Sequence, residues 1–285
     1  AWAANRRGDV AAARRWAVDG LEISRQLATP RGQITCLELL AVAEREAGEH
    51  AAALRYLEEM RRRSRPIGHS WDEGVAQYQT GEVLARQGRY GEARACLDGG
   101  LAVFRAMADA NYEAAALASL VRLHTTLGDL ARARVYLEQL DGLIATGAVQ
   151  YNIAEWEIAR ALLAERAGDA AQALAAAERA AAAARSAGQR LRQGDALVIA
   201  GRAHERAGRW EEAAAAHSEA LACYKSLGHA PLREGRRACA GHLGRLDSRA
   251  RRVAYATAPL AVRRAARQQP AGCPRKHWCP GCLGW

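Results

Sequence analysis

A glycine recurs every 40 residues along most of this 285-residue chain, and an alanine follows each of these glycines five residues later. A fixed period of this length is the signature of a repeat architecture, in which each unit packs mainly against its neighbours. The repeat therefore limits the fold to an array that grows in one direction. The six glycines and six alanines are Gly8, Gly48, Gly88, Gly128, Gly168 and Gly208, and Ala13, Ala53, Ala93, Ala133, Ala173 and Ala213.

Each repeat is predicted to be a pair of helices. Apolar residues between the glycines follow helical spacing, as in Leu117, Leu120 and Val121, and no segment alternates as a strand would. A charged residue follows every repeat glycine, so the glycine is expected to end one helix at positive φ while the next helix begins at once. The alanine five residues later lies in the first turns of that second helix, where a small side chain lets two helices approach closely. A second small residue, 20 positions after each glycine, is predicted to end the second helix: Ala28, Gly68, Ala108, Ala148, Gly188 and Gly228.

The predicted fold is all-α, a right-handed solenoid of about six stacked antiparallel hairpins over residues 1–243. The first hairpin is expected to be truncated, and residues 232–243 are expected to form a closing helix. Because both methionines are internal, the chain is expected to be a fragment of a longer protein. Residues 244–285 are predicted to form a basic, proline- and cysteine-containing tail without regular structure. The expected hairpins span residues 1–28, 33–67, 73–107, 112–146, 152–187 and 191–227.

The repeat resembles the tetratricopeptide repeat. The pattern is most complete at Gly201, Gly208, Arg209, Trp210, Ala213 and Ala220, and an earlier copy keeps Gly81, Gly88, Arg89, Tyr90 and Ala93. The other four copies lose the first glycine and mostly lose the aromatic residue. The period of 40, against about 34 in the standard repeat, is similar to the arrays of bacterial multidomain signalling and transcription regulators.

This resemblance implies a groove lined by the first helix of each hairpin, which would bind a protein or peptide, or another part of the same chain. Arg86, Arg166 and Arg206 share one repeat position and would form a line suited to an acidic peptide. The alternative is a solvated helix face with intrahelical ion pairs. The Asn and Lys set by which co-chaperone arrays of this family clamp a C-terminal carboxylate is missing, so a chaperone-tail ligand is disfavoured. The implied groove residues are Arg45, Tyr78, Glu82, Arg86, Arg122, Thr125, Glu155, Glu165, Arg166, Arg202, Glu205 and Arg206.

The tail carries most of the chain's positive charge. Residues 245–285 hold nine basic residues and one acid, a charge of +8 out of a net +10. Nucleic-acid binding is therefore not expected of the array, and a contact through the tail remains an alternative function. Soft ligands in the tail are candidates for binding zinc, but their spacing matches no standard finger, and a non-native reading frame would explain them equally well. These metal candidates are Cys273, His277, Cys279 and Cys282.

Catalytic motifs are missing from the sequence. There is no phosphate-binding P-loop, no dinucleotide fingerprint and no nucleophile elbow, and His204 and His217 near Glu205 and Glu219 do not form a HExxH motif. The chain is expected not to be an enzyme and to need no cofactor. A third hypothesis places an enzyme, such as an ATPase or cyclase, upstream of this segment.

Targeting signals are also missing. No secretory leader is recognisable, and no run of about 18 apolar residues occurs, so a cytoplasmic location without membrane contact is expected. The favoured function is a non-catalytic protein-interaction scaffold, serving as the regulatory or sensor segment of a bacterial signalling or transcription regulator. The identity of the ligand does not follow from the sequence.

Overall fold

The computed structural model describes residues 1–65, 68, 70–149, 152–226, 241–242 and 244. These residues contain twelve α-helices and no strand. The chain divides into two compact units, Ala1–His242 and Leu243–Trp285, and all twelve helices lie in the first. No helix of the described residues combines the length and apolar character needed to span a membrane.

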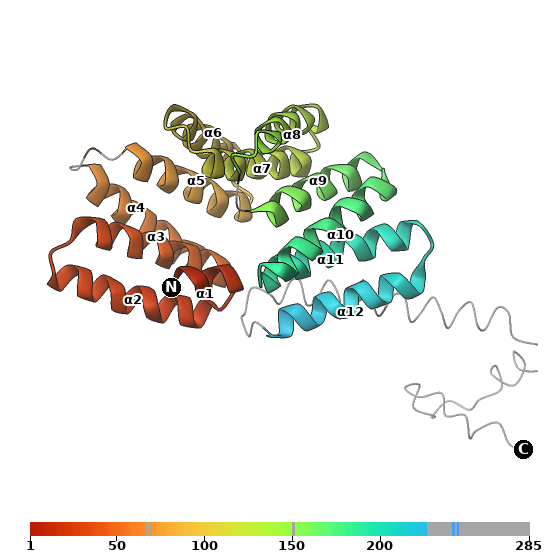
Figure 1. Ribbon diagram of the computed structural model, residues 1–285, viewed down its shortest axis with the longest axis horizontal. Coiled ribbons are helices and arrows are strands. Elements are labelled where there is room, and N and C mark those ends of the chain that lie inside the picture. Colours follow the sequence, from red (N-terminus) through yellow and green to blue (C-terminus); the bar gives the residue numbers. More distant parts are fainter. Residues whose placement is uncertain (66–67, 69, 150–151, 227–240, 243, 245–285) are drawn as a thin grey trace, which may run out of the picture. The chain divides into compact units, whose positions relative to one another are not determined.

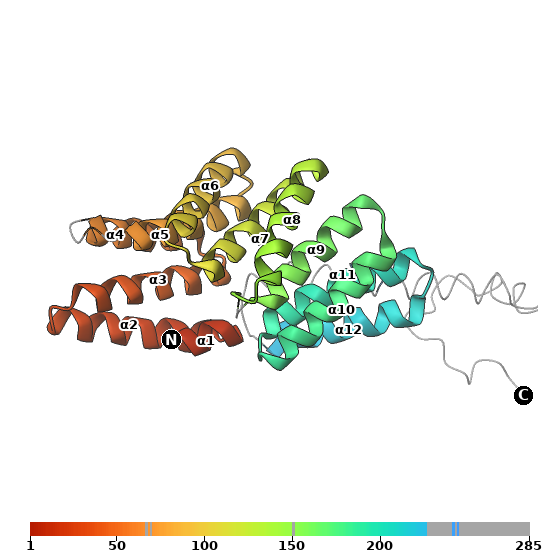
Figure 2. The same cartoon turned by 45° about the horizontal axis from the view of Figure 1, so that its top comes forward.

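The twelve helices form six consecutive antiparallel hairpins, which confirms the predicted all-α solenoid. Figure 1 shows the hairpins following an arch from α2 over α6 and α8 to α12, and Figure 2 keeps α2 and α12 at its two ends. Each pair of helices corresponds to one predicted hairpin, with a shortened first helix in the first pair. The pairs are α1 (Trp2–Arg7) with α2 (Val10–Gln26), α3 (Pro30–Ala47) with α4 (His50–Ser64), α5 (Ser70–Arg86) with α6 (Tyr90–Ala106), α7 (Ala110–Leu127) with α8 (Leu130–Ala145), α9 (Ile153–Ala167) with α10 (Ala170–Ser186), and α11 (Arg190–Arg206) with α12 (Trp210–Ser226).

The repeat glycines sit at the corners of the hairpins. All six have φ between 73° and 85°, the left-handed region that glycine adopts without steric cost. In four of the twelve helices an aspartate follows the preceding corner and its side chain accepts a hydrogen bond from the backbone N–H three residues later, which caps the new helix. A corner glycine and a capping acid together allow two helices to join within two residues.

The second set of corners differs from the sequence prediction in one copy. Ala28, Ala108, Gly68 and Gly188 take positive φ where a small residue was predicted to end the second helix. Ala148 does not, because Gly147 takes φ of 74° one residue earlier, after α8 ends at Ala145. The prediction was wrong there because a left-handed residue costs alanine roughly 1–2 kcal/mol, and a neighbouring glycine avoids that cost. The corner predicted at residue 228 lies outside the described residues.

Gly128→Ala is expected to lower the free energy of unfolding by roughly 1–2 kcal/mol, because φ at this position is 80°. The matched control is Gly142→Ala within α8, where an added methyl group meets no atom within 4 Å. That control is expected to raise stability by about 0.5–1 kcal/mol, since alanine favours a helix interior over glycine. Urea unfolding followed by circular dichroism measures both, and equal effects from the two variants would contradict the corner assignment.

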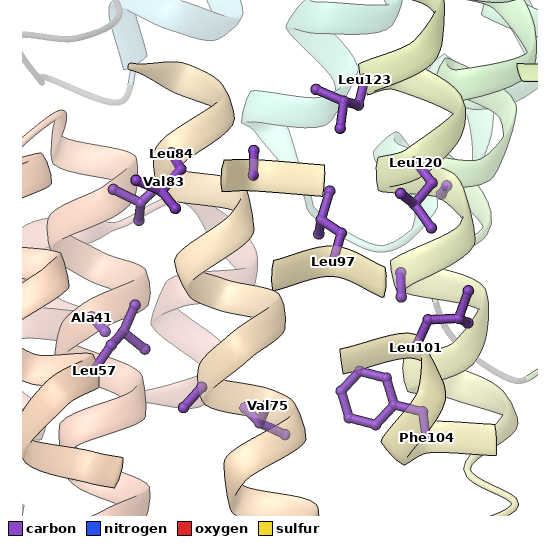
Figure 3. Close-up of a cluster of buried hydrophobic side chains, with 14 of the residues drawn as sticks. Ala41, Leu57, Val75, Val83, Leu84, Leu97, Leu101, Phe104, Leu120 and Leu123 are labelled. Atoms are coloured by element: carbon purple, nitrogen blue, oxygen red, sulfur yellow. The ribbon is translucent and has the colours of Figure 1, made fainter. Parts of the chain in front are cut away.

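The core runs between the hairpins. The six repeat alanines, from Ala13 to Ala213, are fully buried. Larger side chains fill the layers between hairpins, and Figure 3 shows Leu97, Phe104 and Leu120 among them. From α9 onwards the buried core residues are mainly alanines, and α10 alone contributes six of them. The described core therefore changes from leucine-rich to alanine-rich along the array.

Candidate functional site

A cavity of about 240 Å³ opens on the inner side of the array. The side chains that line it come from the first helix of the hairpins: α1, α3, α5, α7, α9 and α11, together with the residues that lead into α9 and α11. The second helix of each hairpin contributes none of the described lining residues. The cavity is therefore a product of the inner helices, which stand in sequence around it.

Glu46 of α3 and Arg192 of α11 meet across this inner side. Arg192 Nη2 lies 3.6 Å from Glu46 Oε1, and its Nε donates to Glu155 Oε1 of α9 at 2.9 Å. Arg192 also lies 3.5 Å from Asp195 on its own helix. Charged side chains of the second, fifth and sixth hairpins are thereby joined, and the arch closes around the cavity.

Glu46 is the centre of this charge cluster. It is buried, with Arg45 at 2.9 Å and Arg86 at 3.1 Å in addition to Arg192. Burial alone would raise the pKa of Glu46, but Arg86, Arg192 and Arg45 together hold it well below its usual range. The carboxylate is therefore ionised at neutral pH, and one buried anion holds three cations from three helices.

A second ion pair joins α5 to α7 at the cavity wall. Arg122 Nη2 donates to both carboxylate oxygens of Glu82, at 2.8 and 2.9 Å, and lies 3.1 Å from Ser119 Oγ. Burial opposes ionisation of Glu82, but Arg122, Arg45 and Arg86 lower its pKa to about 2. The guanidinium charge of Arg122 is thus already satisfied within the protein.

Tyrosines form the aromatic part of the wall. The Tyr112 hydroxyl donates to Glu38 Oε1 at 3.0 Å, and burial raises the pKa of both groups. The Tyr112 ring packs edge-on against Tyr78 with centroids 6.2 Å apart, and both rings contact Phe104 behind them. These contacts fix the orientation of the tyrosines and keep their hydroxyls protonated.

Two buried acceptors of the cavity have no hydrogen-bond partner among the described residues. They are Asn5 Oδ1 and Glu155 Oε2. The Asn5 side-chain amide donates to the carbonyl of Leu39, which orients Asn5. A buried polar atom without a partner is costly unless water or a ligand satisfies it, so these two oxygens are the lining acceptors that the described residues leave unsatisfied.

The structure brings together only part of the predicted groove. Arg45, Tyr78, Glu82, Arg122 and Glu155 line the cavity. The other predicted groove residues do not line it. Arg86 contacts Glu46, Arg202 pairs with Glu165 at 2.7 Å, Arg206 donates to the Glu165 carbonyl at 2.8 Å, and Arg166 is exposed. Thr125, Glu165 and Glu205 are also absent from the described lining.

Sequence reasoning missed Asn5, Glu46 and Arg192. Asn5 shares the repeat position of Arg45, so the 40-residue period held a signal for it, whereas no predicted groove residue shares the repeat position of Arg192. Glu46 shares the repeat position of Arg86, Arg166 and Arg206, so the period marked that position as well, but its contact with Arg192 depends on α11 reaching α3. The tail zinc candidates, Cys273, His277, Cys279 and Cys282, lie outside the described residues.

No family model matches the sequence, and no curated protein matches it. Solved structures with a similar fold do exist. The structure of Rap protein complexed with Competence and Sporulation Factor matches with a TM-score of 0.66 and 17% identity, covering 79% of this chain and 61% of the Rap chain. This chain therefore spans about three fifths of the Rap chain.

Two further structures share the fold. Cut9, in the Cut9–Hcn1 hetero-tetramer of APC/C, matches with a TM-score of 0.60 and 13% identity, covering 85% of this chain and 47% of that chain. BtubC from P. vanneervenii matches with a TM-score of 0.54 and 18% identity, covering 77% and 91%. At such low identity these likenesses bear on the fold alone.

Proposed function

We propose that this tetratricopeptide-like array, whose fold resembles those of the Rap protein and Cut9, is a non-catalytic scaffold that binds a peptide segment in its inner cavity. The observation that carries the proposal is the 240 Å³ cavity with its two unpartnered acceptors, Asn5 Oδ1 and Glu155 Oε2. The likeness to Rap, whose structure is a complex with Competence and Sporulation Factor, supports it.

The chemistry of the lining favours a peptide that brings hydrogen-bond donors. The cavity arginines Arg45, Arg122 and Arg192 already contact glutamates of the protein. The lining atoms that still lack a hydrogen-bond partner are therefore oxygen acceptors. Such acceptors suit the N–H groups of a lysine or arginine side chain or of a peptide backbone. A basic side chain is favoured over the acidic peptide that Arg86, Arg166 and Arg206 suggest.

A ligand in the cavity would act on the conformation of the array. It would contact inner helices of several hairpins at once, including α3 and α11, which the Glu46–Arg192 pair joins. Binding would shift the equilibrium from more open forms to the closed arch, by as much as the ligand binds the closed form more tightly than the open ones. This is how the chain would serve as the regulatory segment of a cytoplasmic signalling or transcription regulator.

Ala115→Phe tests the site, because Ala115 lines the cavity and a phenyl ring there would occupy it. An immobilised array of random decapeptides is probed with the labelled wild-type chain, and affinities for the captured peptides are measured by fluorescence anisotropy. We expect basic sequences to be enriched and Ala115→Phe to weaken their binding at least about tenfold, a loss of 1.4 kcal/mol of binding free energy.

The matched control is Ala131→Phe, which adds the same ring to an exposed position of α8 and should leave affinity unchanged. Capture of no peptide, or equal affinity for the wild type and Ala115→Phe, would refute the cavity as the site. Enrichment of acidic peptides whose binding is lost in Arg166→Glu would instead support the exposed arginine line.

A further inference from the structure

Three potential metal ligands converge beside the sixth hairpin. Glu205 Oε1 of α11 lies 3.2 Å from His217 Nε2 of α12 and 2.7 Å from His242 Nδ1, which follows α12 in the chain. One ligand atom from each residue lies within 4.8 Å of the other two. His217 is fully buried, and the two imidazole rings stack with centroids 4.4 Å apart.

The repeat itself does not explain a histidine at position 217. The same position in the other five copies is apolar: Ala17, Leu57, Leu97, Leu137 and Ala177. An added methyl group at Gly201 would lie within 2.6 Å of the His217 ring, just as one at Gly81 would lie 2.7 Å from Leu97. A leucine would therefore fill the place of His217 equally well, and the imidazole introduces a polar group that packing does not require.

His217 presents its Nε2 to the cluster. This nitrogen lies 3.2 Å from Glu205 Oε1, and a neutral imidazole nitrogen beside a carboxylate oxygen is a donor pair that divalent transition metals bind.

We propose that Glu205, His217 and His242 bind one divalent transition-metal ion, with Zn²⁺ as the best fit. Zinc takes imidazole nitrogen and carboxylate oxygen at about 2.0–2.2 Å, so two of its tetrahedral ligands lie roughly 3.3 Å apart. The 3.2 Å separation between Glu205 Oε1 and His217 Nε2 matches this spacing. The 2.7 Å between Glu205 Oε1 and His242 Nδ1 is shorter, and the two rings stack, so the His242 ring would turn away from His217 to bind the same ion. Two imidazoles select zinc-like ions over Mg²⁺ and Ca²⁺, which prefer oxygen. Water would complete the coordination.

The ion would link His242 to both helices of the sixth hairpin. Because it binds the folded arrangement, it stabilises α11 against α12 by mass action. α11 also carries Arg192, which closes the cavity, so metal binding would hold that helix in place. The metal site is independent of the peptide proposal, since no residue of the cluster lines the cavity.

The test is metal titration of the full chain after treatment with a chelator and dialysis. Because the tail has its own soft ligands, the background carries Cys273→Ser, Cys279→Ser and Cys282→Ser. Co²⁺ absorption and Zn²⁺ calorimetry should each give one ion per chain. His217→Leu installs the residue of three other repeats and should keep the fold while weakening binding more than about 100-fold, since even outer-shell changes cost 10- to 100-fold.

His242→Ala should weaken binding to a similar degree, because it removes the third ligand. His204→Ala is the matched control: it removes the histidine next to Glu205 that contributes no atom to the cluster, and affinity should not change. No binding of one Zn²⁺ or Co²⁺ in the cysteine-substituted chain would overturn the proposal, as would unchanged affinity in folded His217→Leu. The cluster would then be a metal-free hydrogen-bonded group.

Discussion

Phe104→Ala should lower the free energy of unfolding by about 3–5 kcal/mol, the largest effect expected from a single core truncation here. Phe104 is fully buried at the end of α6. The centroid of its ring lies 5.0 Å from that of Tyr112 in α7 and 6.2 Å from that of Tyr78 in α5. Its loss would leave a void between the third and fourth hairpins that their rigid helices cannot close. Urea unfolding followed by circular dichroism measures the change.

Met107→Ala is the control for Phe104→Ala. Met107 lies three residues further along the chain and is 52% exposed, so its truncation should change stability little. Because arrays of repeats can unfold in steps, the two variants are compared by the whole unfolding curve. An equal loss for both substitutions would show that Phe104 does not hold the two hairpins together.

Glu46→Gln should lower the free energy of unfolding by about 3–5 kcal/mol, because it removes the buried anion that compensates several cations. Glutamine has nearly the shape of glutamate, so packing is preserved and the measured loss reports charge. The exposed pair of Glu92 with Arg89 provides the control, and Glu92→Gln should have no measurable effect. Thermal unfolding at neutral pH distinguishes the two variants.

The effect of Glu46→Gln should depend on pH with a defined sign. The pKa of Glu46 is well below its unfolded value in the folded chain, and that of Glu82 is about 2. Their contribution to stability is therefore complete above about pH 4.5 and is lost as pH falls through the folded pKa values. The difference in stability between wild type and Glu46→Gln should shrink below about pH 4.5. A constant difference down to about pH 2 would exclude ionised Glu46 as its source.

Local features of the fold were predictable because their causes are local. A glycine followed by a charged residue indicates a left-handed corner and a new helix, and the corners at Gly128 and Gly168 follow that rule. The exception at Ala148 also has a local cause, since the neighbouring Gly147 adopts positive φ at a lower steric cost than alanine. Part of the candidate site followed from the resemblance to the tetratricopeptide repeat. That resemblance implies a groove lined by the first helix of each hairpin, and Arg45, Glu82 and Arg122 lie on those helices.

The rest of the site depends on distances that no single repeat sets. Glu46 and Arg192 belong to the second and sixth hairpins, and they meet only because small rotations between successive hairpins add up to a closed arch. The cluster of Glu205, His217 and His242 likewise requires a residue beyond α12 to return to the last hairpin. Its histidines have no helical spacing that a motif search would recognise.

The sequence by itself determined the repeat, the paired helices, their glycine corners and the buried alanines, because each of these follows from steric and hydrogen-bonding preferences within about 40 residues. The tertiary structure decided where α3 meets α11, how large the enclosed cavity is and which of its acceptors lack partners. Those properties arise from the accumulated curvature of six hairpins, to which every interface contributes a small angle that side-chain packing sets.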